Sequence, residues 1–185
     1  WTARPDPANL AGMARYIDSG GRAEGHCLGD WFATNVIDEL RALRCQFGYF
    51  GYDAIIDFES VIRSVAANGL PVHIVLGANK RALYSDDLAD VLGLLTPSET
   101  CTLTVVSFRN AEFHPKVVQI DRPDGSAAAV VGSGNLTVAG MGLNVEAGVI
   151  MDTRDGDSAD TLSEIASSIE RWHSLDEDAV FRIRG

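Results

Sequence analysis

The 185-residue sequence is poor in cysteine and lysine and has no long hydrophobic run. Its three cysteines are widely spaced and form no C-x-x-C pair, so the sequence predicts neither a disulfide framework nor a zinc site. We interpret them as buried thiols in a reducing compartment and expect a cytoplasmic protein. No apolar segment approaches the roughly 18 residues that a transmembrane helix needs, so we expect no membrane span. The length indicates one domain with a substantial core.

Positive charge is also scarce. The sequence has 15 basic and 26 acidic residues, a formal net charge of −11, whereas nucleic-acid-binding proteins usually present a basic face. The basic residues are thirteen arginines and two lysines, Lys80 and Lys116. Because lysine is so rare here, a lysine that follows a histidine by two residues is more informative than usual.

The first half of the sequence predicts alternating helices and strands. Residues 1–29 are the least periodic part, and we interpret them as a lead-in segment with a short helix at about 8–17. Asp30 is expected to cap the next helix. The elements expected after it are a helix over 31–44, a strand over 45–52, a helix over 54–68, a strand over 72–76 and a helix that Ser85 caps and that stops near Pro97. This order is typical of parallel strand–helix–strand units with right-handed crossovers.

The second half predicts strands that lie too close together for long helices between them. The candidates are residues 102–108, 114–120, 127–131 and 145–150, with a turn at 122–125. A last helix, capped at 157 or 158, should reach Trp172, and residues 176–185 are interpreted as an acidic tail or linker. The predicted fold class is therefore α/β, with a mixed, mainly parallel β-sheet flanked by helices on both faces, in a domain over 30–175.

The segment Phe-His-Pro-Lys at 113–116 has the clearest chemical meaning. Residues two apart in a strand point to the same side, so His114 and Lys116 should present an imidazole and an ammonium group on one face. Pro115 removes a backbone donor, which suits the start of a strand rather than the centre of a sheet. A nucleophile beside a fixed cation suggests chemistry on a phosphate ester.

Two later segments extend this pattern. Gly132, Ser133 and Asn135 follow a β-branched strand, where glycine permits close approach of a ligand and the polar side chains supply neutral donors for phosphate oxygens. Glu146 lies in the next predicted strand and needs a partner. An imidazole N–H is a suitable one, because a carboxylate behind a histidine fixes its tautomer.

These residues resemble the motif of the phospholipase D superfamily, H-x-K-x4-D followed by G-S-x-N and then a supporting acid. The matching residues are His114, Lys116 and Asp121, then Gly132, Ser133 and Asn135, and finally Glu146 in the place of the acid. The motif covers about a fifth of the chain, and the strand–helix–strand pattern before it is also similar to that family's fold.

The resemblance implies a role for each residue. It implies that His114 attacks phosphorus to give a phosphohistidine, that Lys116 and Asn135 hold the non-bridging oxygens, and that Glu146 orients His114. Asp121 would be structural rather than catalytic. No metal ion and no other cofactor is needed in such a mechanism.

Other polar residues near the motif are candidates for binding the substrate. Gly132 and Ser133 are expected to contact it through the turn that they form. Arg109, just before the motif strand, is a further candidate, although a capped turn explains it as well.

The sequence has one copy of the motif, whereas the implied reaction needs a second histidine to protonate the leaving group. The other histidines, His26, His73 and His173, lie in no matching context. Members of the family with one motif place two copies of the histidine in one shared site by two-fold pairing. We therefore expect a homodimer in which two copies of His114 meet.

The leading hypothesis is a metal-independent nuclease similar to the single-motif nucleases and the restriction-enzyme catalytic domains of this superfamily, with DNA favoured over RNA. A role in restriction or defence rests on analogy alone. Because the chain is acidic, we expect DNA recognition to lie in a separate domain or subunit. A lipid phosphodiesterase or transphosphatidylase, and a catalytically inactive dimeric interaction module, are the alternatives. A broad apolar patch around the cleft would favour the lipid enzyme, and a large separation of His114 from Glu146 would favour the module.

Overall fold

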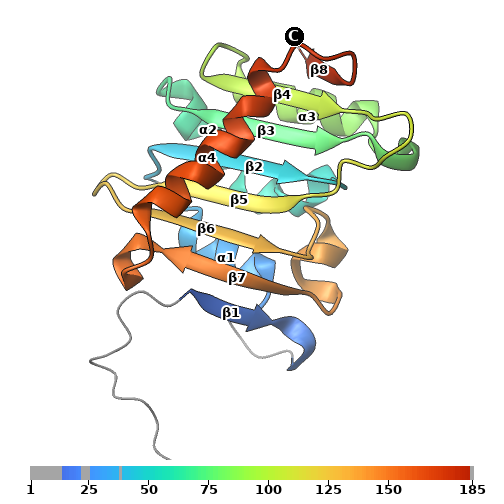
Figure 1. Ribbon diagram of the computed structural model, residues 1–185. Coiled ribbons are helices and arrows are strands. Elements are labelled where there is room, and N and C mark those ends of the chain that lie inside the picture. The colour runs from blue at the N-terminus through green and yellow to red at the C-terminus, as the bar shows by residue number, and fades with distance from the viewer. Residues whose placement is uncertain (1–13, 22–25, 38, 184–185) are drawn as a thin grey trace, which may run out of the picture.

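A computed structural model describes residues 14–21, 26–37 and 39–183, which form an eight-stranded sheet with helices on both faces (Figure 1). The strands are β1 (Arg15–Asp18), β2 (Ala42–Phe47), β3 (Val72–Gly77), β4 (Cys101–Val106), β5 (Lys116–Asp121), β6 (Ala127–Gly132), β7 (Ala147–Asp152) and β8 (Val180–Ile183). The α-helices are α1 (Leu28–Asn35), α2 (Glu59–Ala67), α3 (Ser85–Leu95) and α4 (Ala159–Ser174). The predicted α/β class is confirmed.

The strand order across the sheet is β1-β7-β6-β5-β2-β3-β4-β8. The sheet is mixed, as expected, but the prediction that it is mainly parallel was wrong. Strand β3 pairs in parallel with β2 and β4, whereas the other neighbouring strands pair antiparallel. The reason is the short spacing after β4, because antiparallel strands need only a tight connection and a parallel pair needs a long crossover.

The helices divide between the two faces of the sheet. Helix α4 crosses one face diagonally, while α1, α2 and α3 lie on the other (Figure 1). On the α4 side, Ile169 packs against Val75, Val106, Phe113 and Val117. Burial of apolar side chains on both faces is what holds the sheet between the helices.

The structure corrects the elements expected over 31–52. Helix α1 begins after Cys27, which caps it together with Asp30, and it ends at Asn35. Strand β2 begins at Ala42, within the segment that was predicted to be helical. All six β2 residues are buried between β3 and β5, so the pairing of a central strand overrides a helical spacing of apolar residues.

The two terminal segments also differ from expectation. Strand β1, within the predicted lead-in, pairs antiparallel with β7, and β8, within the predicted tail, pairs antiparallel with β4. The helix expected at 8–17 lies mostly outside the described residues, and Arg15–Asp18 is a strand. The helices and strands predicted between residues 72 and 174 are confirmed with small shifts at their ends, as is the turn before Gly125.

A buried histidine on the α4 face gives the fold a pH dependence. Nδ1 of His73 lies 2.9 Å from Thr102 Oγ1, and its ring stacks on His173 at 5.9 Å. Burial lowers the pKa of His73 from 6.5 to about 4, against an opposing effect of Glu170. The unfolded chain therefore binds a proton that the folded chain excludes between these pH values, and stability is lost as the pH falls from about 6.5 to about 4.

The expected loss attributable to His73 is on the order of 3 kcal/mol. Urea unfolding at several pH values should show a shallower loss over this range for His73→Gln than for the wild type. His26→Gln, which changes an exposed histidine, is the matched control and should follow the wild type. Equal pH slopes for His73→Gln and the wild type would refute this assignment.

Candidate active site

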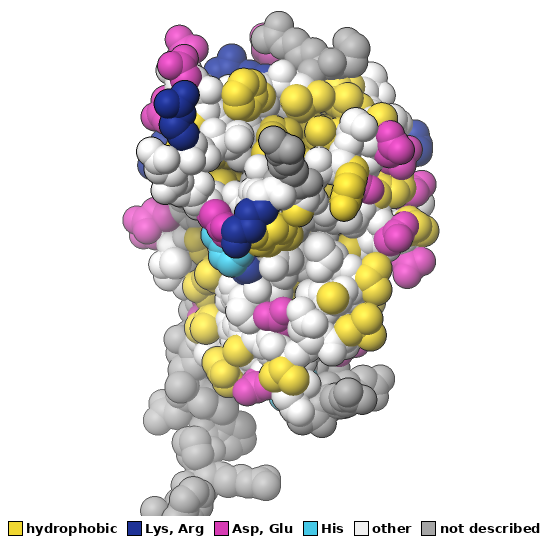
Figure 2. Space-filling model, turned by 90° about the vertical axis from the view of Figure 1, so that its right-hand side faces the viewer, with side chains coloured by type: hydrophobic (Ala, Val, Ile, Leu, Met, Phe, Trp, Pro, Cys, Tyr) yellow, Lys and Arg dark blue, Asp and Glu magenta, His cyan; other side chains and the backbone are white. Residues whose placement is uncertain are grey.

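All candidate site residues except Asp121 lie at one edge of the sheet, where β2, β3 and β6 end and β5 and β7 begin. Figure 2 shows this edge, with a histidine side chain among basic and acidic ones. Ligands of open α/β sheets bind outside the carboxyl ends of parallel strands. This edge is therefore the natural place for a site.

His114 and Lys116 are brought together as the sequence predicts. His114 lies just before β5 rather than in it, and its side chain is exposed, whereas Lys116 is 9% exposed. Nζ of Lys116 lies 2.9 Å from Nδ1 and 3.1 Å from Nε2 of His114, and it donates to the His114 carbonyl oxygen at 3.1 Å. Burial lowers the pKa of Lys116, and Glu146 partly opposes this effect. A poorly hydrated ammonium group is thus fixed beside the imidazole.

A buried amide fixes the backbone that carries His114. Asn79 is 5% exposed; its Nδ2 donates to the carbonyl oxygens of Gly48 at 2.9 Å and Phe113 at 2.7 Å, and its Oδ1 accepts from the Phe113 amide at 3.1 Å. A Cβ atom at Gly48 would lie 2.8 Å from Cδ2 of His114. Asn79 was not among the residues predicted from the sequence. Its position just after the carboxyl end of β3 is the feature that could have indicated a role in the site.

The Gly-Ser-Gly-Asn turn after β6 reaches the same edge. Oδ1 of Asn135 accepts from the Tyr49 amide at 3.2 Å, and the Tyr49 ring meets the His114 ring edge-on with centroids 5.5 Å apart. Gly140 lies in a π-helix (Ala139–Leu143) directly against the Asn135 backbone, where a Cβ atom would overlap it. Tyr49 is half-buried and lines this site beside His114.

The hydrogen-bond partners of Glu146 differ from the one expected. Its carboxylate accepts from Ser133 Oγ and, at 3.2 Å, from Asn144 Nδ2. No hydrogen bond joins it to His114 among the described residues. Glu146 precedes β7 and His114 precedes β5, with β6 between them, a separation of two strand spacings or roughly 10 Å. The orienting role that the resemblance implies is therefore not formed by a direct contact within one chain. This separation counts for the inactive interaction module, whereas the contact between His114 and Lys116 counts for an active site.

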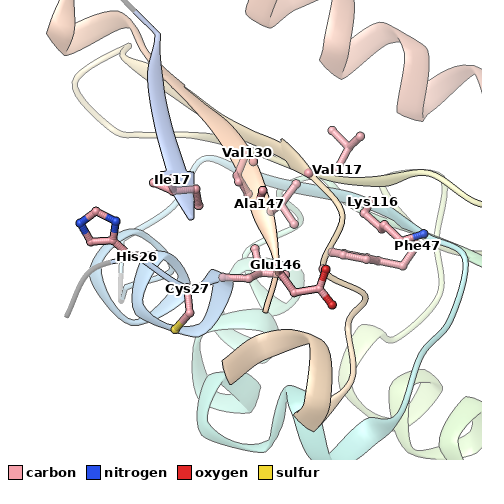
Figure 3. A pocket seen from close by; sticks show the side chains of 14 residues that line it. Ile17, His26, Cys27, Phe47, Lys116, Val117, Val130, Glu146 and Ala147 are labelled. Carbon is pink, nitrogen blue, oxygen red and sulfur yellow. The ribbon is translucent and has the colours of Figure 1, made fainter. Parts of the chain in front are cut away.

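Glu146 and Lys116 nevertheless line one small cavity of about 20 Å³. In Figure 3 the Glu146 carboxylate is on the side of Lys116 and Phe47, whereas Ile17 and Cys27 lie at the other end. Such a volume holds about one water molecule. The carboxylate thus shares the immediate surroundings of the cation without pairing with it directly.

Of the remaining candidates, Asp121 and Arg109 lie outside the cavity that Lys116 and Glu146 line, whereas Gly132 also lines it. Asp121 is at the far end of β5, where it accepts from Arg44 at 2.7 Å and from Gln119 at 2.7 Å. These contacts support a structural role. Arg109 lies exposed in the β4–β5 connection and lines an open pocket of about 340 Å³ together with Lys80. Gly132 closely approaches the β7 backbone, where a Cβ atom would lie 2.6 Å from the Ala147 carbonyl oxygen.

The described residues offer neither a metal site nor a membrane-spanning helix. They contain no group of three or more His, Cys, Asp or Glu side chains arranged to hold a metal ion. Within the same part of the chain, no helix is both long and apolar enough to cross a membrane.

Comparison with known proteins identifies the family. Residues 42–172 match the model described as "Cardiolipin synthase, PLD-like domain". The chain therefore belongs to the phospholipase D superfamily of phosphodiesterases, as the motif predicted. No curated protein sequence matches the chain.

Solved structures show the same fold at low sequence identity. The phospholipase D family member Nuc from Salmonella typhimurium is 15% identical with a TM-score of 0.62, and the match covers 94% of this chain and 99% of that one. NucT from Helicobacter pylori is 14% identical with a TM-score of 0.59, covering 86% and 94%. Phosphatidylserine synthase from Haemophilus influenzae Rd KW20 is 13% identical with a TM-score of 0.57, covering 92% of this chain but 40% of that one.

Proposed function

We propose that this protein is a metal-independent nuclease, acting on DNA in preference to RNA, at a site shared by two copies of the chain. The observation that carries the proposal is the exposed His114 imidazole beside the buried Lys116 ammonium, 2.9 Å away, at the edge where the Asn135 turn also lies. A nucleophile and a fixed cation are the two groups that covalent phosphoryl transfer needs when no metal is used.

The reaction proceeds in two displacements. A ring nitrogen of His114 attacks phosphorus, the bond to the leaving oxygen breaks, and that oxygen takes a proton from the second copy of His114. Water then gives a proton to this second imidazole and attacks phosphorus, and the phosphorus–nitrogen bond breaks. Lys116 and Asn135 stabilise the negative charge on the non-bridging oxygens in both steps. Both histidines return to their starting states.

An exposed apolar row supports the pairing of two chains. Val131 in β6, Val149 in β7 and Tyr16 in β1 occupy paired positions, so their side chains share one face of the sheet. They are 38%, 37% and 63% exposed. The row lies next to the candidate site, because Val131 immediately precedes Gly132 at the end of β6. We assign a second copy of this chain to this surface, since it would bring a second His114 to the site, and no other histidine among the described residues is hydrogen-bonded to or stacked on His114.

The net charge of −11 suggests that sequence recognition lies in a separate domain or subunit, because this chain has little general attraction for DNA. A place in restriction or defence is an analogy with other members of the superfamily.

A lipid phosphodiesterase is the second candidate. Leu143 and Val145, on either side of Asn144 and next to Glu146, are each 73% exposed. Exposed apolar side chains beside a phosphodiesterase site are what a membrane-surface enzyme would present. The structural matches favour the nuclease, because they cover 99% of Nuc and 94% of NucT but 40% of the phosphatidylserine synthase.

The test is hydrolysis in EDTA. The wild type should cleave single- or double-stranded DNA in EDTA and leave phosphatidylglycerol vesicles intact, with His114→Ala as the blank. Hydrolysis of the vesicles without cleavage of DNA would favour the lipid enzyme. Cleavage that requires a divalent metal would refute the mechanism, and no hydrolysis of either substrate would favour the interaction module.

A further inference from the structure

The two lysines of this sequence lie at the same edge of the sheet, although 36 positions separate Lys80 from Lys116. Lys116 contacts His114, and the His114 ring meets the Tyr49 ring. Lys80, which also interacts with Tyr49, forms an ion pair with Glu112 at 2.8 Å. Hydrogen bonding to Glu112, with a smaller effect of Tyr49, raises the pKa of Lys80. The second lysine is therefore a charged neighbour of the candidate site.

The backbone of Lys80 is unusual. It adopts φ 49° and ψ 27°, in the left-handed region that favours glycine. Its neighbour Asn79 points inward and fixes the backbone of His114, whereas the Lys80 side chain is 73% exposed. The Asn79 side chain therefore supports the backbone of the site, and the Lys80 side chain, next in the chain, lies at the outer margin of the site. Backbone strain of this kind concentrates at functional sites.

Lys80 also lines a defined space. An open pocket of about 340 Å³ lies between the β3–α3 and β4–β5 connections. Its polar lining residues are Asn79, whose amide is already hydrogen-bonded to the backbone, and Lys80, Arg109, Asn110 and Glu112. Two cations and one amide can donate hydrogen bonds to an anion there. The pocket therefore offers a second group of phosphate donors beside the His114 site.

The ion pair with Glu112 does not block this pocket. The two side chains are 73% and 37% exposed, and ion pairs between exposed groups are weak and screened by salt. A phosphate group can therefore take the place of the Glu112 carboxylate. Until that occurs, Glu112 holds the long Lys80 side chain over the pocket.

We propose that Lys80 and Arg109 bind a phosphate next to the scissile one, so that a single strand of nucleic acid runs from the His114 site past Tyr49 into this pocket. This inference rests on the proposed nuclease function and extends it to the path of the substrate. A substrate with two or more consecutive phosphodiesters uses both sites, whereas a dinucleotide fills only the first.

Salt-dependent binding tests the contact directly. A fluorescein-labelled oligothymidylate of twelve nucleotides would be titrated by fluorescence anisotropy against His114→Ala, which does not cleave it, at several salt concentrations. Adding Lys80→Gln should weaken binding and reduce the slope of log Kd against log salt by about 0.7, the value for one lost contact to single-stranded DNA. Arg154→Gln is the matched control, because it removes a cation from an exposed ion pair with Asp124. An unchanged slope for Lys80→Gln would overturn the proposal.

Substrates of different length distinguish a phosphate contact of Lys80 from an indirect effect of Lys80 on the His114 site. In chains that retain His114, Lys80→Gln should lower kcat/KM for a tetranucleotide by about tenfold. The same substitution should lower kcat/KM for a dinucleotide much less. Equal losses on both substrates would overturn the subsite and make Lys80 a positioning residue. If the wild type cleaves oligonucleotides and Lys80→Gln matches it, only the subsite fails. If the wild type binds no oligonucleotide, the nuclease function fails as well.

Discussion

Replacing His114 with alanine should lower phosphodiester hydrolysis by at least about 10⁴-fold, because loss of a nucleophile removes the covalent pathway itself. In a shared site, the same substitution also removes the group that protonates the leaving oxygen. Lys116 and Asn135 remain, and they can still bind the phosphate. Substrate binding should therefore change much less than turnover, which steady-state kinetics and anisotropy would show separately.

The substitution should leave the fold intact. His114 is exposed, and its contacts are the Lys116 amine and the edge of the Tyr49 ring, so thermal unfolding should match the wild type closely. Arg154→Ala, which removes a cation from an exposed ion pair with Asp124, should keep full activity. Substantial residual hydrolysis by His114→Ala would show that another group attacks phosphorus.

Replacing Tyr16 with glutamate should convert a dimer to a monomer and reduce activity about 100-fold at nanomolar concentrations. The charge would lie in the apolar row formed with Val131 and Val149, where a second chain is proposed to pack, and burial of an unpaired carboxylate there is costly. Tyr16 is in the edge strand β1, two strands away from β6, so its effect on hydrolysis should come through pairing. Sedimentation velocity would measure the change in mass.

A matched substitution distinguishes this effect from a general one. Tyr84, which precedes α3, is 68% exposed, compared with 63% for Tyr16. Tyr84→Glu should remain a dimer and keep its activity. If Tyr16→Glu also remains a dimer, or becomes an active monomer, the apolar row is not the surface that pairs two chains.

The contact between His114 and Lys116 was predictable from the sequence because the two residues lie close together in the chain. The spacing of His114 and Lys116 placed the two side chains on the same side. The glycines before Asn135 were expected to admit a ligand, whereas Gly132 and Gly134 pack closely against the backbone of Ala147 and Gly140. Family membership followed from the same residues and was confirmed by the match over residues 42–172.

The arrangement of the sheet was not predictable in the same way. The distance between Glu146 and His114 depends on β6 lying between β5 and β7, and strand order is a long-range property that no local spacing records. Strands β1 and β8 have four residues each, too few for an alternating pattern to stand out. Asn79 acts only through contacts with Gly48 and Phe113, both more than 30 positions away.

The central claim is that each chain supplies half of a phosphodiesterase site, and mixing active with inactive chains tests it most directly. Wild type and His114→Ala would be mixed at equal concentration, unfolded and refolded together, and assayed at constant total protein. If one site needs two intact copies of His114, only dimers of two wild-type chains are active, and activity should fall to about one quarter of that of the pure wild type. An activity of about one half would show that each chain works alone and would contradict the account.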